Sequence, residues 1–318
     1  VVASIDSAFW PWAAAVESSP AADSVTSNKS PASQSYVAGT TTLSLTGDDE
    51  STEVSLPFAF AYYGQTYSSA FVSFATPLRV DLDIPKISGV HIFQDVLAVG
   101  VNVTSGAAPA GGTGPILTIA PGSSLAFSDN TDYLVINRGS QIIADGTASQ
   151  PIVFTSVTDA VLHTVTPEAV QQWGGIIING NGITNNCTDA QRAANDCHVQ
   201  SEGQPVYYGG NDNAESSGVL RYVVVKHPGA EVAPDDELNG ITFNTVGSGT
   251  IVSYVETYST YDDGLEFFGG AVNVDHYVAV YVRDDTIDFT DGYIGTIDTA
   301  LIVQAQRDGN RCIEGDNI

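Results

Sequence analysis

The fold class that this sequence predicts is all-β: a right-handed parallel β-helix preceded by an irregular β-rich N-terminal segment. Between residues 218 and 304, short apolar runs return at a near-constant interval, with acidic turns between them. The segments 239–243 and 263–268 repeat each other about 24 residues apart, and periods of roughly 20 to 50 residues indicate a solenoid. The runs are rich in β-branched and aromatic residues bounded by Gly, Asp and Asn, so the repeating unit is a strand. Right-handedness follows from the general preference for right-handed crossovers.

Strands of the β-helix are expected from about residue 87 onward, each a short apolar run that ends in a turn. Pro-Gly, Arg-Gly and Asp-Gly pairs provide the turns between the earlier runs. The one helix-permissive stretch is 167–172. Insertions at 179–204 and 207–217 should protrude as loops, and in solenoids such loops often carry the binding face. The expected strands are 116–120, 133–136, 151–155, 220–225, 251–255, 277–282 and 297–303.

Three regions are predicted along the chain. Residues 1–50 form a Ser/Ala/Thr-rich arm, 51–86 a β-rich segment or cap, and 87–318 the parallel β-helix, which is expected to continue beyond 318. In the second region Gly64 lies between two aromatic runs and predicts a hairpin. The arm is expected to fold back on its own rod. The alternative is that it adds a strand to another subunit, and such head-to-tail contacts give a filament.

Composition limits the possible partners. The chain has 10 basic and 37 acidic residues and a net charge of −27, which would repel nucleic acid and anionic membranes. No stretch approaches the roughly 20 apolar residues that span a bilayer, so no membrane span is predicted. The five histidines are scattered without metal-ligand spacing, which argues against zinc. The acidic balance favours solvated cations and a saline, extracellular setting.

The cysteines predict one disulfide. Cys187 and Cys197 flank a short polar segment, with no second pair at the spacing of a metal site, so a loop-closing disulfide is the favoured interpretation. Such a bond implies an oxidising compartment. Cys312 is left without a partner.

A cluster of acidic residues predicts a calcium site. A coil of about 24 residues would place Asp262 and Asp263 beside Asp284 and Asp285, and Ca²⁺ prefers many hard oxygen ligands. The alternative is that these residues only form turns by bonding their own backbone. The predicted ligands are Asp262, Asp263, Asp284, Asp285, Asp288 and Asp291.

Several segments of the β-helix region resemble a large family of secreted bacterial β-helix proteins with a pectate-lyase-like fold. They are 117–122, 146–156, 173–178, 238–242, 262–270 and 284–292, and the resemblance covers about 97 to 318. It implies a right-handed coil and a secreted or outer-surface location in a bacterium, which the acidic composition suggests is marine. The family has no established common activity. Residues 56–74 also resemble a short β-sandwich motif of other secreted bacterial proteins.

Two functions from different classes follow. The favoured one is a structural or adhesive extracellular rod, stabilised by Ca²⁺, that belongs to a filament or matrix through self-association or binds a surface glycan or protein. The alternative is a secreted carbohydrate-active enzyme that acts on a marine glycan. As a hydrolase it would use Asp262, Asp263 and Glu266 as acid and base. As a polysaccharide lyase it would use Ca²⁺ and Arg283, as the resemblance to lyases of this fold implies.

Overall fold

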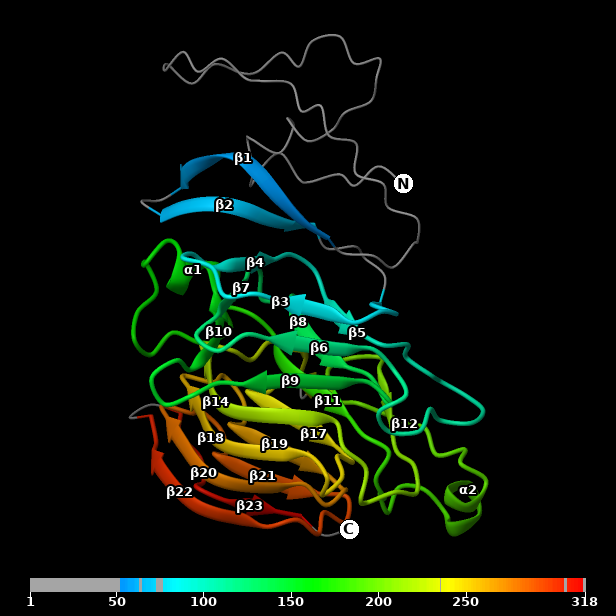
Figure 1. Cartoon of the computed structure of the whole chain (residues 1–318). Coiled ribbons are helices and arrows are strands. Elements are labelled where there is room, and N and C mark those ends of the chain that lie inside the picture. Colours follow the sequence, from blue (N-terminus) through cyan, green and yellow to red (C-terminus); the bar gives the residue numbers. More distant parts are fainter. Residues whose placement is uncertain (1–51, 63–64, 73–76, 235, 306–307, 317–318) are drawn as a thin grey trace.

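A computed structural model of the chain describes residues 52–62, 65–72, 77–234, 236–305 and 308–316 (Figure 1). These residues are almost all in strands, and most strands pair in parallel. The predicted class, an all-β parallel β-helix, is therefore confirmed. The predicted arm of residues 1–50 lies outside the described residues.

A hairpin precedes the β-helix. Strand β1 (Thr52–Tyr62) pairs antiparallel with β2 (Gln65–Val72), and Tyr62 lies opposite Gln65. The hairpin that Gly64 predicted is therefore present. It lies at the N-terminal end of the helix, above the first coils in Figure 1.

The first sheet of the helix has one short strand from each coil. Each strand pairs in parallel with its equivalent in the next coil, so the sheet grows along the axis. The segments 239–243 and 263–268 that predicted the repeat are in register here, with Ile241 opposite Leu265. In axial order the strands are β5 (Leu97–Val99), β8 (Tyr133–Ile136), β11 (Gly175–Asn179), β17 (Ile241–Asn244), β19 (Leu265–Phe268), β21 (Ile287–Thr290) and β23 (Glu314–Gly315).

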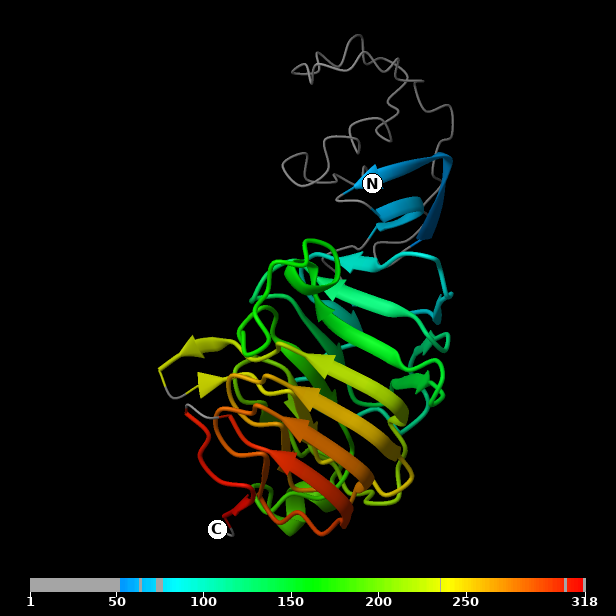
Figure 2. The same ribbon diagram turned by 90° about the vertical axis from the view of Figure 1, so that its left-hand side faces the viewer.

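The other two sides of the coil form one sheet of ten strands. Figure 2 shows the strands of this sheet stacked one beneath another along the axis. In the early coils each side has its own strand, and β14 then pairs with both β9 and β10. In the later coils one long strand covers both sides by bending at a single residue with positive φ. The strands are β3 (Leu82–Ile84), β4 (His91–Phe93), β6 (Ile116–Ile119), β7 (Ser124–Phe127), β9 (Gln141–Asp145), β10 (Ile152–Ser156), β14 (Gly218–Lys226), β18 (Ile251–Tyr258), β20 (Asn273–Val280) and β22 (Ile297–Val303).

The bends occupy equivalent positions in successive coils. Tyr222, Tyr254, His276 and Thr299 have φ of 49°, 54°, 57° and 62°. The rings of the first three stack on one another, 4.6 Å and then 4.4 Å between centroids. Non-glycine residues avoid this left-handed region unless their surroundings favour it, and here the ring stacking offsets part of the cost.

The core is a set of side-chain rows inside the coil. The rings of Phe243 and Phe267 stack 5.1 Å apart, and those of Phe127 and Trp173 stack 4.5 Å apart. Trp173 is fully buried and donates its Nε1–H to the carbonyl of Lys226, so its polar atom is satisfied. Each coil thus buries its apolar residues against its neighbours, as in other solenoids.

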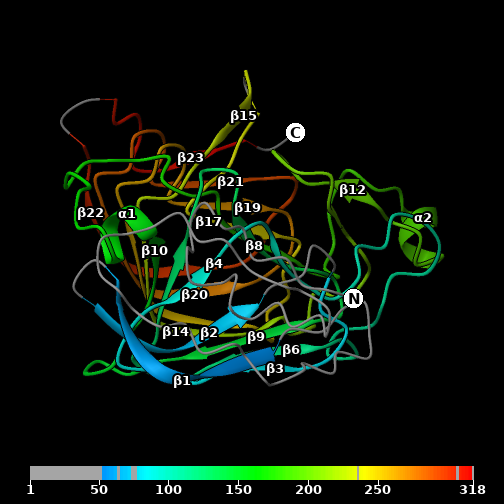
Figure 3. The same cartoon turned by 90° about the horizontal axis from the view of Figure 1, so that it is seen from above.

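The insertion of residues 180–217 leaves the coil after β11. It contains α2 (Asp189–Ala193) and a hairpin of β12 (Val199–Gln200) and β13 (Tyr207–Tyr208). Helix α2 protrudes from the rod, as Figure 3 shows, but the hairpin lies against the first sheet, with Gly209 N–H donating to Thr245. The predicted disulfide Cys187–Cys197 is present inside the insertion.

A buried arginine fastens the insertion to the coil. Arg138 is 2% exposed, and its guanidinium donates to the carbonyls of Cys197 at 2.8 Å and Gly209 at 2.7 Å. It also contacts the Val103 carbonyl and lies 2.7 Å from Nδ1 of His198. Burial lowers the pKa of Arg138 to about 10, which leaves the group charged at neutral pH.

The two short helices lie outside the one stretch that the sequence marked as helix-permissive. Residues 167–172 form turns and irregular backbone, whereas α1 (Val157–Ala160) and α2 form elsewhere. Both helices begin at a hydroxyl cap, Ser156 and Thr188. A side-chain acceptor at the N-cap satisfies a free backbone N–H, and this local bond decides where such short helices start.

Candidate metal centre

Carboxylates line the outer face of the first sheet in its last coils. The register places Thr242, Glu266, Asp288 and Glu314 opposite one another in successive strands. Glu266 alternates with the core residues Leu265 and Phe267, so its side chain points away from the core. Because neighbouring strands lie about 4.8 Å apart, the carboxylates of this row are close together.

The turn that leads into these strands carries a second row, which we call the backbone ladder. Its side chains are Asn239, Asp263 and Asp285, and each accepts a hydrogen bond from the backbone N–H of the equivalent residue one coil later. The last of these donors is Arg311. One oxygen each of Asp263 and Asp285 is thus bonded to the backbone of the following coil, and not to the backbone of its own turn.

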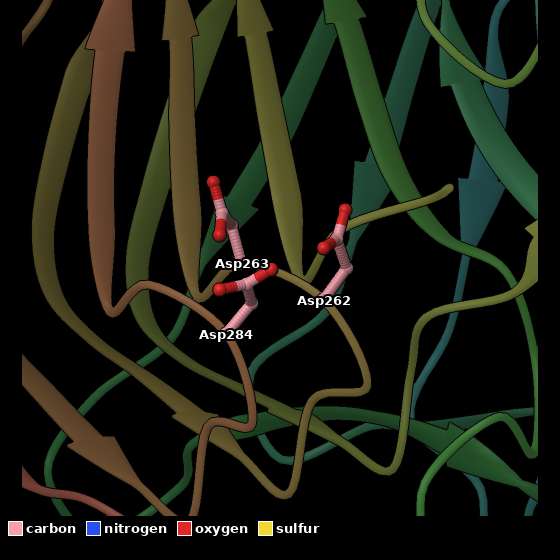
Figure 4. A group of neighbouring side chains, drawn as sticks. All are labelled: Asp262, Asp263 and Asp284. Atoms are coloured by element: carbon pink, nitrogen blue, oxygen red, sulfur yellow. The ribbon is translucent and has the colours of Figure 1, made fainter. Parts of the chain in front are cut away.

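The two rows meet in an acidic cluster: Asp262, Asp263, Glu266, Asp284 and Asp288. It contains two trios whose ligand atoms all lie within 4.8 Å of one another, Asp262–Asp263–Asp284 and Asp263–Glu266–Asp288. Asp263 belongs to both. Figure 4 shows the first trio at the start of neighbouring strands, where the predicted register of Asp262 and Asp263 with the next coil is realised.

Burial and crowding make it costly to ionise the whole acidic cluster. Burial, and then the charge of Glu202, raises the pKa of Asp262 to about 8. Burial and the charge of Asp262 raise the pKa of Asp263 to about 10. Burial likewise raises the pKa of Glu266 well above its usual value and raises that of Asp288. The cluster must therefore hold protons or a cation at neutral pH.

Glu202 joins the cluster from outside the coil, and the sequence did not single it out. It lies in the turn of the β12–β13 hairpin, against Glu266 and Asn239. Burial and the nearby Asp236 and Glu237 raise its pKa. The only sequence signal was its place in an insertion, which was expected to carry the binding face.

Two of the predicted metal ligands, Asp285 and Asp291, lie outside the two trios. Asp285 accepts from the backbone N–H of Arg311 and lies 3.5 Å from its guanidinium. Asp291 follows the far end of β21, where its carboxylate accepts from the hydroxyl of Tyr208 at 3.1 Å and from the Asn186 amide. At about 3.3 Å per residue, Asp291 is roughly 10 Å along the strand from Asp288.

A pocket of about 520 Å³ lies beside the acidic cluster. Arg283 lies in it, but its guanidinium donates to the carbonyl of Glu168 at 3.2 Å and is 3.9 Å from Asp308. The hairpin of β15 (Glu231–Ala233) and β16 (Asp236–Glu237), which projects from the rod in Figure 2, reaches one wall through Tyr261 and Glu231. The lining residues are Glu237, Tyr261, Asp262, Arg283, Asp284, Asp308, Gly309 and Asn310.

The pKa of Asp263 predicts how the cation-free protein responds to pH. A carboxyl whose folded pKa is raised holds its proton more tightly in the folded state, so stability falls as pH rises from about 4 towards 10. Asp263→Asn keeps an acceptor for the backbone ladder, as Asn239 does naturally, and removes the ionisation. In chelator, the variant should melt above wild type at pH 8 and match it at pH 4.

Melting curves in EDTA across this pH range test the expectation. Asp298→Asn is the matched control, because it makes the same chemical change at an exposed side chain on β22. If Asp298→Asn shifts the melting temperature as much as Asp263→Asn does, the effect comes from net charge and not from the burial of Asp263.

Comparisons with known proteins give one match. A family profile described as a pectate-lyase-like beta helix domain matches residues 108–318. No curated protein matches the chain. No solved structure matches it either. A search of the described residues for a helix long and apolar enough to cross a membrane found none.

Proposed function

The chain belongs to the family of pectate-lyase-like beta helix domains, and from this premise we propose that it is an extracellular β-helix rod stabilised by Ca²⁺. The observation that carries the proposal is the acidic cluster. Each of its two trios brings carboxylates from two neighbouring coils within 4.8 Å of one another. Ca²⁺ takes six to eight hard oxygen ligands, so the cation would neutralise the repulsion and tie successive coils together.

The structural role has support beyond the cluster. The disulfide Cys187–Cys197 suits an oxidising compartment, and the net charge of −27 suits a solvated, secreted or outer-surface bacterial protein. The projecting β15–β16 hairpin and α2 offer surfaces for a glycan or protein partner. The proposal includes self-association into a filament or matrix.

Calcium should raise the melting temperature. A ligand at about 100 times its Kd adds about 2.7 kcal/mol of stability, and a chain of this size gains roughly 2–4 °C per kcal/mol. The gain should be larger at pH 8 than at pH 5, because protons compete for the same carboxylates. The measurement is thermal melting in EDTA and in CaCl₂ at matched ionic strength, with MgCl₂ as the comparison. An unchanged midpoint would contradict the proposal.

A second candidate, a carbohydrate-active enzyme, is supported by the pocket. Carboxyls whose pKa is raised, such as Asp262 at about 8, can donate a proton at neutral pH, and they lie beside a pocket that also holds Arg283. Incubation with polyuronates and neutral glycans tests this function through new reducing ends or unsaturated products. Asp262→Asn serves as the inactive control. If none of the glycans yields a product, the enzyme function is rejected.

A further inference from the structure

Residues 167–169, which we call the strap, are bonded to three successive coils of the rod. Each of their three carbonyls accepts a hydrogen bond from a side chain of a different coil. The pairs are Ala169 with Nδ1 of His227 at 2.6 Å, Pro167 with the hydroxyl of Ser259 at 2.7 Å, and Glu168 with the guanidinium of Arg283 at 3.2 Å. The three donors follow β14, β18 and β20, so the strap ties these coils together from outside.

His227 is the one donor of the three that is both buried and able to titrate near neutral pH. Its side chain is 2% exposed, and its ring lies edge-on to that of Tyr258, 5.4 Å between centroids. Because Nδ1 donates to the carbonyl of Ala169, the neutral ring carries its proton there, and a second proton must go to Nε2. Nε2 is 3.9 Å from Oδ1 of Asp159, beyond hydrogen-bond distance.

Asp159 is already paired with another cation. Its Oδ2 accepts from Nζ of Lys226 at 2.5 Å and from the hydroxyl of Thr155 at 2.7 Å. A protonated His227 would therefore share one carboxylate with Lys226 and have almost no access to water. Burial lowers the pKa of His227 below its ordinary value of 6.5, and the charge of Lys226 lowers it further, although Asp159 partly offsets both effects. The other ionisable groups next to Asp159 or Tyr258 are His163, Glu168, Glu256 and Tyr281.

We propose that His227 is an acid-sensitive attachment of the strap, and that a proton on its Nε2 releases residues 167–169 from the rod. Once the strap opens, water can solvate the imidazolium, so protons favour the open form. Release would also take the Glu168 carbonyl away from Arg283, so acid would change how this guanidinium is held at the pocket. The device lies apart from the acidic cluster and needs no cation.

His227→Gln tests the attachment, with His163→Gln as the matched control. Glutamine keeps an N–H donor for Ala169 but does not titrate. His163 lies in the same segment and is exposed. Hydrogen exchange of the amides in 163–172 is measured in EDTA at pH 5 and pH 7.5 and expressed as protection relative to the intrinsic rate. Exchange of the β14 and β18 amides in the same samples shows whether each variant is folded.

In the wild type, protection of 163–172 should fall by about threefold or more between pH 7.5 and pH 5. The limit is about 30-fold, set by a ring that titrates at its ordinary pKa of 6.5 in the open form. His163→Gln should show the same fall, and His227→Gln should show none. Protection that does not depend on pH in the wild type, or that still falls in His227→Gln, would overturn the proposal. A second measurement needs no variant: if NMR shows that the His227 ring of the folded wild type titrates at or above pH 6.5, the proposal is wrong.

Discussion

Replacement of Phe267 by alanine should lower the free energy of unfolding by about 3–5 kcal/mol, the usual range for a phenylalanine lost from a core. Phe267 is fully buried on β19, with its ring stacked between those of Phe243 at 5.1 Å and Tyr293 at 4.6 Å. Alanine would leave a cavity within this row. Because coils support each other only through their neighbours, the loss should also weaken the coils on either side.

Denaturant unfolding measures the effect, and the adjacent Phe268→Ala is the control. Phe268 points out of the coil, is half-buried and meets Tyr208 at a centroid distance of 6.2 Å. Phe268→Ala should lower the free energy of unfolding by less than half as much as Phe267→Ala. Equal losses would show that the two faces of β19 are packed alike, contrary to the alternation of the strand.

Arg138→Met should destabilise the protein by about 3 kcal/mol or more. Methionine keeps the apolar stem but leaves the carbonyls of Cys197 and Gly209 without their Arg138 donor, and each unsatisfied buried group costs about 1–3 kcal/mol. The damage should concentrate in the insertion, so protease should cut within residues 180–217 before the coils unfold.

The comparison for this variant is Arg221→Met. Arg221 is 37% exposed in its side chain and pairs with Asp145 at 3.3 Å, and exposed ion pairs contribute about 0–1 kcal/mol. Unfolding free energies and proteolysis of both variants are measured together. Similar behaviour would show that Arg138 does not hold the insertion.

The coil could be predicted because its information is local and repeated. Segments 239–243 and 263–268 align by eye, and that spacing placed Asp262 and Asp263 beside the following coil. The bends could not be predicted. Tyr254 and His276 lie within continuous β-forming runs, and their positive φ depends on ring stacking between coils, which one strand does not encode.

The site was only partly predictable for a similar reason. Asp262, Asp263 and Asp284 come together because the repeat brings them together. Glu202 reaches the same cluster through the path of an insertion, which is set by long-range contacts such as Arg138 with Cys197. Asp291 was grouped with Asp288 on sequence proximity alone, although a strand carries neighbours away from each other along its length.

Because of the backbone ladder, a single coil could be deleted or duplicated without interrupting the hydrogen bonds between coils. The hydrogen bonds of the ladder join residues that are 24, 22 and 26 positions apart. The length of the coil therefore varies, while the hydrogen bond between coils stays the same. A deletion of residues 263–284 would bring Asp285 next to Asp262, and Asn239 would then accept from the N–H of Asp285. A gene can therefore lose or duplicate such a segment and still encode a continuous ladder. A rod of this kind can gain or lose whole coils during evolution and keep the same turn in each coil.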